Sequence, residues 1–296
     1  DEYVPVMRQE HADRYIDALA YSEKSQSHKH HTLHSLKRYF KWRHHVYGEP
    51  EWEPERSFTI SNGQTPQDYF KKPERRRLRQ VALDYETIPA YRTVKCHEAR
   101  RERLKPYVAE YHDITTGEVG VDHWEGVPSW RYTTIVWTSL DAGLRPDEVK
   151  KAKTWWVDTE NAVLRIPKEE ASKSDNNWEV SLREKTAEAL ALWLHERSHY
   201  PKYDDTDRLW LTNHSNPFGA RQLGRIIRRL CEEADIDQEH RSLSWYSIRH
   251  SVGTYMTREE DLAATQAQLR HKRAETTMKY DAAPAEDRRD ALNRMG

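Results

Sequence analysis

Apolar residues recur at helical spacing twice within the first 47 residues of the chain. The first stripe consists of Tyr15, Ile16, Leu19 and Ala20, and the second of Leu33, Leu36, Tyr39 and Phe40. Side chains three or four positions apart share one face of an α-helix, so both segments are predicted to be helical. A stretch rich in glycine and proline, 48–66, then interrupts the pattern. We therefore predict a small helical domain over 1–70 and a larger domain over 71–296.

The pattern changes from helical to alternating in the middle of the chain. Two apolar segments, 155–157 and 162–166, flank a polar turn, which is typical of a β-hairpin. Trp178, Val180 and Leu182 then alternate with polar residues and predict a third strand. We expect a small antiparallel sheet, with a second polar turn between the last two strands.

Helical patterns dominate the rest of the larger domain. Helices are predicted in the segments 97–112, 190–194, 223–230 and 285–295. A further apolar segment, Thr133–Leu140, is followed by Gly143, which stops it. Pro146 suits the first turn of a new helix, so Arg145 is expected at a rigid helix entry. The predicted fold class is mainly α with a small antiparallel β-sheet.

Composition restricts the function less than the motifs do. The formal net charge is -1, so a nucleic-acid partner would have to be bound through local basic patches. The two cysteines are too few for a disulfide framework and are expected to be free thiols in a reducing compartment. No apolar stretch approaches the roughly 20 residues that span a bilayer. We expect a cytoplasmic, nucleoid-associated protein without a signal peptide or a membrane partner.

Two basic segments are candidates for contacts with DNA phosphates. The first contributes Lys71, Lys72, Arg75, Arg76 and Arg77, and the second contributes Arg221, Arg225 and Arg228 on the polar face of a predicted helix. Lysine and arginine bind the DNA backbone by releasing its condensed counterions. The alternative for each segment is a solvated helix surface without a partner.

The last quarter of the chain holds residues suited to one reaction, the attack of a tyrosine hydroxyl on a DNA phosphodiester. Arg249 lies in Tyr-Ser-Ile-Arg-His, His271 in Leu-Arg-His, and Tyr280 nine residues later, whereas Arg145 lies upstream in Gly-Leu-Arg-Pro-Asp-Glu. Two guanidinium groups can bind the non-bridging oxygens of one phosphate. A tyrosine can hold the broken strand covalently. On one continuous helix His271 and Tyr280 would face opposite ways, so a turn is expected between them.

These motifs, in this order, resemble those of the tyrosine recombinase (phage integrase) family over roughly 130–285. The residues within the motifs are most similar to those of archaeal members. The family pattern is Arg, Lys, His-x-x-Arg, His or Trp, and Tyr. Tyr246 stands where the family usually has the first histidine. The resemblance implies a helical core-binding domain that embraces DNA, a catalytic domain, and a synaptic tetramer on double-stranded DNA that carries a specific recombination site.

The resemblance also implies a role for each residue in a site-specific recombinase or integrase. Arg145 and Arg249 would clamp the phosphate, His271 would contact it or help to move a proton, and Tyr280 would form a 3′-phosphotyrosine. A lysine on the turn between the second and third strands would protonate the leaving oxygen. Lys173 is the first candidate for that lysine and Lys168 the second.

Tyr246 and His250, which are close to Arg249 in the sequence, are also assigned roles from their positions. Tyr246 is expected to donate a hydrogen bond to a phosphate oxygen, because a phenol is a poor base at neutral pH. His250 is expected to point away from the site as a structural hydrogen-bonding group.

Other functions remain as alternatives. A type IB topoisomerase would use similar residues, and a non-catalytic DNA-binding accessory factor could descend from a recombinase. The histidine-rich stretch 28–45 lacks carboxylate or cysteine partners at ligand spacing, so no metal site is expected. No phosphate-binding glycine loop is present, which gives no sign of ATP use, and no cofactor is expected.

Overall fold

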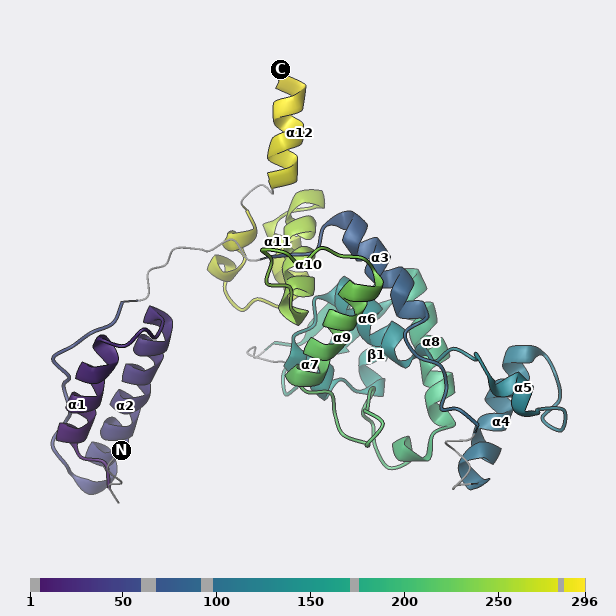
Figure 1. Cartoon of the computed structure of the whole chain (residues 1–296), viewed down its shortest axis with the longest axis horizontal. Coiled ribbons are helices and arrows are strands. Elements are labelled where there is room, and N and C mark those ends of the chain that lie inside the picture. The colour runs from purple at the N-terminus through teal and green to yellow at the C-terminus, as the bar shows by residue number, and fades with distance from the viewer. Residues whose placement is uncertain (1–5, 60–67, 92–97, 171–175, 282–284, 296) are drawn as a thin grey trace. The chain divides into compact units, whose positions relative to one another are not determined.

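The computed structural model describes residues 6–59, 68–91, 98–170, 176–281 and 285–295 (Figure 1). The chain divides into two compact units, Asp1–Thr65 and Pro66–Gly296. The sequence-based boundary at 70/71 differs from this division and stays a prediction.

The first unit is a pair of helices, α1 (Gln9–Ala20) and α2 (Gln26–Tyr47), with an extended segment after them. Ser25 caps α2 by accepting a hydrogen bond from the His28 amide, and Gly48 ends it in the left-handed conformation that glycine adopts without strain. The core of the unit contains Ile16, Leu19, Leu33, Phe40 and Trp52. Ile16 and Leu19 of the first predicted stripe therefore pack with Leu33 and Phe40 of the second, whereas Tyr15 is exposed.

The second unit is built around α6 (Trp130–Ala142). Nine of the 13 residues of α6 are buried, because α3 (Lys72–Leu83), α8 (Glu184–Ser198) and α10 (Trp245–Glu259) all pack against it. Gly143 ends the helix with a positive φ of 59°. The apolar segment before Gly143 is therefore a central helix, and its end points the chain toward Arg145.

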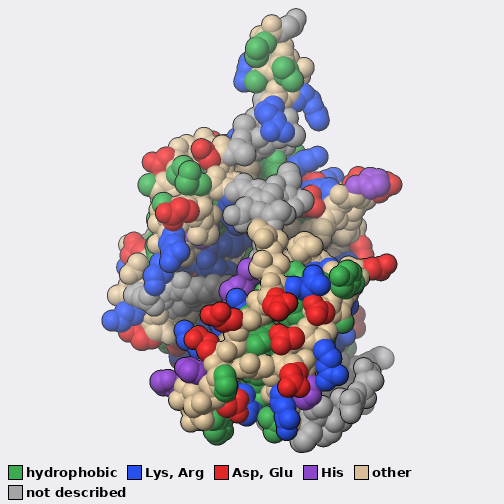
Figure 2. All heavy atoms as spheres, turned by 90° about the vertical axis from the view of Figure 1, so that its left-hand side faces the viewer, with side chains coloured by type: hydrophobic (Ala, Val, Ile, Leu, Met, Phe, Trp, Pro, Cys, Tyr) green, Lys and Arg blue, Asp and Glu red, His purple; other side chains and the backbone are tan. Residues whose placement is uncertain are grey.

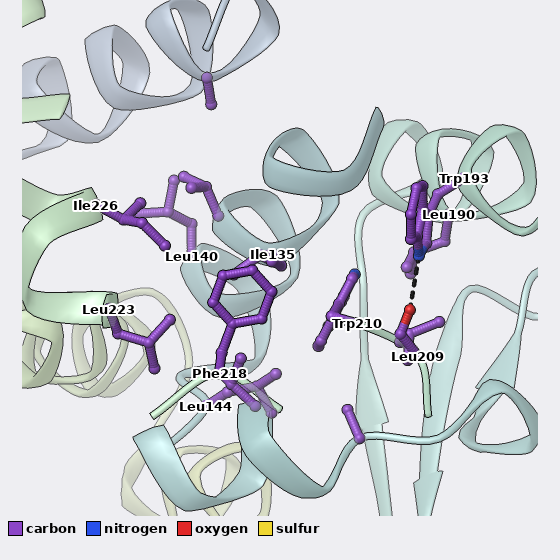
Figure 3. Close-up of a cluster of buried hydrophobic side chains, with 14 of the residues drawn as sticks. Ile135, Leu140, Leu144, Leu190, Trp193, Leu209, Trp210, Phe218, Leu223 and Ile226 are labelled. Atoms are coloured by element: carbon purple, nitrogen blue, oxygen red, sulfur yellow. Dashed lines mark hydrogen bonds between the residues drawn. The ribbon is translucent and has the colours of Figure 1, made fainter. Parts of the chain in front are cut away.

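The core of the second unit joins side chains from several helices and loops (Figure 3). Leu190 and Trp193 of α8 face the loop residues Leu209 and Trp210, and the Trp193 indole donates a hydrogen bond to the Leu209 carbonyl at 2.9 Å. On the other side of α6, the apolar face of α9 (Ala220–Glu233) contributes Leu223 and Ile226. The large aromatic residues compensate for the low apolar content of the chain.

The remaining helices range in length from four residues to 15 residues. The helices are α4 (Glu98–His112), α5 (Val121–Trp124), α7 (Pro146–Lys151), α11 (Leu262–Leu269) and α12 (Ala285–Met295). Four 3₁₀ turns complete the list: η1 (Thr154–Trp156), η2 (Pro201–Tyr203), η3 (Ala274–Thr276) and η4 (Met278–Tyr280).

The sheet has three antiparallel strands in the order β1 (Val157–Asp158), β2 (Val163–Ile166) and β3 (Trp178–Ser181). This confirms the predicted fold class. The first strand is shorter than expected, because Trp155 and Trp156 form η1 and Trp156 is buried there. The Gln268 side chain bonds both the amide and the carbonyl of Ser181, which joins α11 to the strand β3.

Charged side chains of both signs are interspersed over the surface that Figure 2 presents. None of the described helices is long and apolar enough to cross a membrane. Within the described ranges, no group of three or more His, Cys, Asp or Glu side chains is arranged to hold a metal ion.

Candidate active site

The candidate site lies where α6 ends and α7, α10 and the end of α11 meet. Gly143 provides the close approach, because a Cβ atom there would lie 2.6 Å from the Leu269 side chain. A larger residue there would force the Leu269 side chain to shift. The backbone conformation of Gly143 also has the positive φ that side chains with a Cβ rarely adopt.

The Arg249 side chain forms hydrogen bonds with both the end of α6 and the end of α11. Its guanidinium group is buried and donates to the Gly143 carbonyl at 2.7 Å and to the Leu269 carbonyl. Burial lowers the pKa of Arg249 to about 9, and the neighbouring Arg270 and Arg145 act in the same direction. A side chain with that pKa is still a cation at neutral pH. Since two of its five N–H groups serve the two carbonyls, others remain to bind an oxyanion.

Glu148 organises the other arginines. This buried carboxylate accepts from the Arg145 amide at 2.6 Å and from the Arg145 guanidinium at 2.9 Å. Arg270 also donates to it, through two N–H groups at 3.0 and 2.9 Å. Burial alone would raise the pKa of Glu148, but Arg270 and Arg145 lower it to about 2.

The charges of this cluster do not balance. Arg145, Arg249 and Arg270 carry three positive charges, and Glu148 supplies one negative charge among them. Excess positive charge in a poorly solvated place favours an anion, because burial weakens the competition from water. The cluster therefore suits a phosphate group.

His271 and Tyr280 lie beside the cluster. The expected turn between them is present, because η3 and η4 interrupt the chain after α11. The Nδ1 atom of His271 lies 2.8 Å from the Thr277 hydroxyl, and its ring stacks parallel to that of Tyr280 with 6.1 Å between centroids. Burial lowers the pKa of His271 to about 3, with Arg249 and Arg145 acting in the same direction. The imidazole is therefore neutral at neutral pH.

Tyr280 packs against α10 at Gly253, where no side chain blocks the approach of its ring. A Cβ atom at Gly253 would lie 2.5 Å from the Tyr280 ring. Burial raises the pKa of Tyr280 to about 12, although Arg249 and Arg145 pull it down. Its hydroxyl lies 3.1 Å from Nδ1 of His250.

The position of His250 corrects a prediction. His250 was expected to point away from the site, but its ring lies against Tyr280. The physical reason is that Tyr280 folds back over the outer face of α10, where His250 and Gly253 are one turn apart. Adjacency to Arg249 was the only sequence signal, and it did not reveal this contact.

Arg270 is a second residue that the sequence did not single out. It caps α11 in the left-handed conformation with φ of 56°, which a residue with a Cβ atom adopts at a cost. Its buried side chain bonds Glu148 and also the carbonyls of Ala142 and Gln268. A signal was present, since Arg270 immediately precedes His271 in the Leu-Arg-His motif.

Tyr246 and Lys168 lie outside the buried cluster, and the structure does not describe the third candidate, Lys173. Tyr246 lies in the first turn of α10, its side chain is 48% exposed, and its hydroxyl bonds no described residue. Lys173 falls in 171–175, outside the described residues. Lys168 is exposed on the connection between β2 and β3, where its amide donates to the Asn177 side chain at 2.9 Å.

The predicted DNA-contacting cations divide into two groups. Lys71, Arg76, Arg77, Arg221, Arg225 and Arg228 are exposed, and Lys72 is exposed but paired with Glu259. Arg75 differs from them, because its guanidinium turns inward to the Ser251 hydroxyl and the Leu140 carbonyl. Burial lowers the pKa of Arg75 to about 10. Arg75 therefore joins α3 to α6 and α10 rather than facing solvent.

Comparison with known proteins places these features in context. Residues 127–286 match the model of the phage integrase family. No curated protein matches the chain in sequence.

Solved structures that resemble this chain include two recombinases and a transposon integrase. XerA recombinase is similar with a TM-score of 0.53 and 18% identity, over 99% of this chain and 85% of that one. XerH site-specific recombinase, in a post-cleavage complex with a palindromic difH substrate, gives 0.62 and 17%, over 97% and 72%. The Tn1549 transposon integrase, in complex with a circular intermediate DNA, gives 0.54 and 14%, over 97% and 85%. At these identities the likeness concerns the fold.

Proposed function

Because this chain belongs to the phage integrase family, whose model covers 160 of its 296 residues (127 to 286), we propose that Tyr280 is the nucleophile with which it cuts and rejoins DNA. The protein is a tyrosine-type site-specific DNA recombinase. The observation that carries the assignment of residues is the buried cluster of three arginines and one carboxylate beside Tyr280.

The arginines would bind the scissile phosphate. Arg145 and Arg249 come from different segments, yet each influences the pKa of Tyr280 and of His271, which places all four in one electrostatic environment. Attack on phosphorus concentrates negative charge on the non-bridging oxygens. Cations that are already in place stabilise that charge more in the transition state than in the ground state.

The proposed reaction exchanges one phosphodiester for another. The Tyr280 oxygen forms a bond to phosphorus as the bond to the 5′ oxygen breaks, which leaves a 3′-phosphotyrosine. The leaving 5′ oxygen takes a proton from Lys173, or from Lys168 if that lysine occupies the site. The 5′-hydroxyl of a partner strand then attacks the phosphotyrosine. No ATP is consumed, because the covalent link conserves the energy of the broken strand.

The remaining contacts with DNA are part of the same proposal. The exposed cations Lys71, Lys72, Arg76, Arg77, Arg221, Arg225 and Arg228 would contact phosphates, and the helices of 1–70 would embrace the duplex. Four copies would assemble on two duplexes at the nucleoid. Neither a topoisomerase nor a non-catalytic accessory factor is favoured, since the family model and the structural relatives are those of recombinases.

A nicked suicide substrate tests the nucleophile. Cleavage beside the nick releases a short strand, so the covalent adduct accumulates on the parent protein. Tyr280→Phe should abolish the adduct and leave DNA affinity nearly unchanged, because the ring that packs on Gly253 remains. The readouts are denaturing gel electrophoresis for the adduct and a mobility shift for binding. An adduct formed by Tyr280→Phe would show that another residue attacks.

A further inference from the structure

We infer that His250 is the group that accepts the hydroxyl proton of Tyr280 as the tyrosine attacks DNA. The inference rests on the proposed role of Tyr280. Its first support is direct contact, since Nδ1 of His250 lies 3.1 Å from the Tyr280 oxygen. A general base must lie within hydrogen-bond reach of the proton that it removes, and His250 meets that condition before DNA binds.

The contact is built into the fold rather than made by a mobile side chain. His250 and Gly253 are three residues apart on α10, so they share one face of the helix. The missing side chain at Gly253 lets the Tyr280 ring lie on that face. The ring centroids of His250 and Tyr280 are 6.1 Å apart. Tyr280 is therefore positioned by α10 so that its hydroxyl reaches the imidazole.

The protonation state suits an acceptor. Burial lowers the pKa of His250 to about 4, and Lys279 and Arg249 act in the same direction. The ring is therefore neutral at neutral pH, and Nδ1 accepts the hydroxyl proton when Nε2 carries the ring proton. Binding of an anionic phosphate beside Arg249 would offset the repulsion and strengthen the base.

Other candidates for the base are less well placed. His271 has its Nδ1 atom bonded to Thr277, and its ring lies parallel to Tyr280 rather than pointing at the hydroxyl. Tyr246 stands where the family usually has a histidine, but it is 48% exposed and its hydroxyl makes no hydrogen bond to a described residue. A phenol is also a poor base at neutral pH. His250 has both the hydrogen-bond contact with the Tyr280 hydroxyl and a neutral imidazole that can accept its proton.

The proton balance of the step is complete. As the bond between the Tyr280 oxygen and phosphorus forms, the hydroxyl proton passes to Nδ1 of His250. As the bond between phosphorus and the 5′ oxygen breaks, that oxygen takes a proton from the lysine general acid. Rejoining reverses both transfers: the imidazolium returns its proton to the departing tyrosine, and the lysine accepts one from the attacking hydroxyl.

The test separates proton transfer from positioning. His250→Asn retains a hydrogen-bond acceptor close to the place of Nδ1 but cannot take up a proton. In single-turnover cleavage of the suicide substrate, we expect a rate at least about 100-fold below that of the parent protein, with DNA affinity unchanged. His250→Gln provides a second variant if the first folds poorly.

Fluorotyrosine at position 280 provides the discriminating readout. Fluorine lowers the phenol pKa, so the attack depends less on a base. The rate defect of His250→Asn should shrink several-fold when both proteins carry fluorotyrosine at 280. A substrate with sulfur in place of the bridging 5′ oxygen is the control: it should rescue a Lys173→Ala variant, which lacks the acid, and should not rescue His250→Asn.

The possible failures are distinguishable. Cleavage by His250→Asn at the parent rate would overturn the inference, and so would a defect of equal size with tyrosine and fluorotyrosine, which would indicate positioning alone. Either result would leave the nucleophile assignment intact as long as Tyr280→Phe forms no adduct. An adduct with Tyr280→Phe would instead overturn the proposed function itself.

Discussion

At the scale of single residues, the site depends on side chains whose ordinary charge or conformation has been changed by burial. Glu148 stays ionised only because two arginines bond it. Arg270 occupies a left-handed position that a glycine would occupy without strain. The strain is offset by the buried ion pair, so Arg270 contributes to stability and also keeps Glu148 in place to orient Arg145.

Replacement of Arg270 tests this balance. In Arg270→Gly the backbone strain is relieved, but Glu148 loses one of its two arginine partners. Removing one member of a buried ion pair costs about 3–5 kcal/mol, and the relief returns about 1–2 kcal/mol. We expect a net loss of about 1–4 kcal/mol in the free energy of unfolding, measured with urea. The double variant Arg270→Gly/Glu148→Gln should recover part of the lost free energy of unfolding. An unchanged urea midpoint in Arg270→Gly would show that the ion pair with Glu148 does not stabilise the fold.

Tyr246 remains the largest departure from the family pattern. It lies three residues before Arg249, on the same face of α10, and its exposed hydroxyl is accessible to a phosphate oxygen. We expect Tyr246→Phe to slow single-turnover cleavage about 100-fold without weakening DNA binding, and Tyr246→His to keep activity. If Tyr246→Phe cleaves at the parent rate, the hydroxyl takes no part in the reaction.

At the scale of elements, α9 presents two different faces. Leu223, Ile226 and Leu230 are buried in the core, whereas the opposite face carries exposed arginines. Among the described residues, no ion pair neutralises Arg221, Arg225 or Arg228. This face is therefore available to an anionic partner.

The salt dependence of DNA binding tests the arginine face of α9. Replacing Arg221, Arg225 and Arg228 together by Ala should weaken binding and flatten the plot of log affinity against log salt by up to about three units of slope. Arg229→Ala is the matched control on the same helix, because Arg229 is already paired with Glu233 and lies over the Tyr85 ring. An unchanged slope in the triple variant would exclude the contact.

Local patterns predicted the elements well because each depends on neighbours in sequence. The apolar stripes of α1 and α2, the hairpin, and the end of α6 at Gly143 follow from spacing and from backbone preference. The contact between His250 and Tyr280 spans 30 residues, and that between Arg270 and Glu148 spans 122. Neither has a periodic signature, so each emerges only once α10, α11 and α7 are packed.

Contacts between distant residues also explain why one cation of the basic segment that begins at Lys71 does not face solvent. Its composition indicated a solvated or DNA-facing surface for every cation. Arg75, however, bonds Ser251 and Leu140, which are 176 and 65 residues away in the sequence. The direction of a long side chain from a helix is set by what packs beside it, and composition does not contain that information.

At the scale of the whole molecule, the chain is nearly neutral, although its candidate site carries an excess of positive charge. The formal net charge is -1, yet the site holds three arginines around one carboxylate. α12 adds a further feature, because Leu292 and Met295 are largely exposed on it. A short helix with exposed apolar side chains gains stability by docking on another surface.

Truncation tests whether α12 serves assembly. We expect a chain that ends at Pro284 to bind a single site normally but to form the four-subunit complex on two duplexes poorly. The double variant Leu292→Ala/Met295→Ala should reproduce the defect, and Asn293→Ala on the same helix should not. The measurement is the yield of synaptic complex by native gel or light scattering. Normal synapsis by the truncated chain would mean that α12 is dispensable for assembly.

The proximity of Tyr280 to α12 along the chain has a consequence for the order of events. Four residues, 281–284, separate the proposed nucleophile from the helix. Between the Cα atoms of Tyr280 and Ala285, this segment spans at most about 18 Å even when fully extended. A surface that binds α12 therefore also keeps Tyr280 within that distance of the start of the helix. If α12 docks on a neighbouring subunit, that contact also limits where the proposed nucleophile can lie, so assembly and cleavage would be coupled through this short segment.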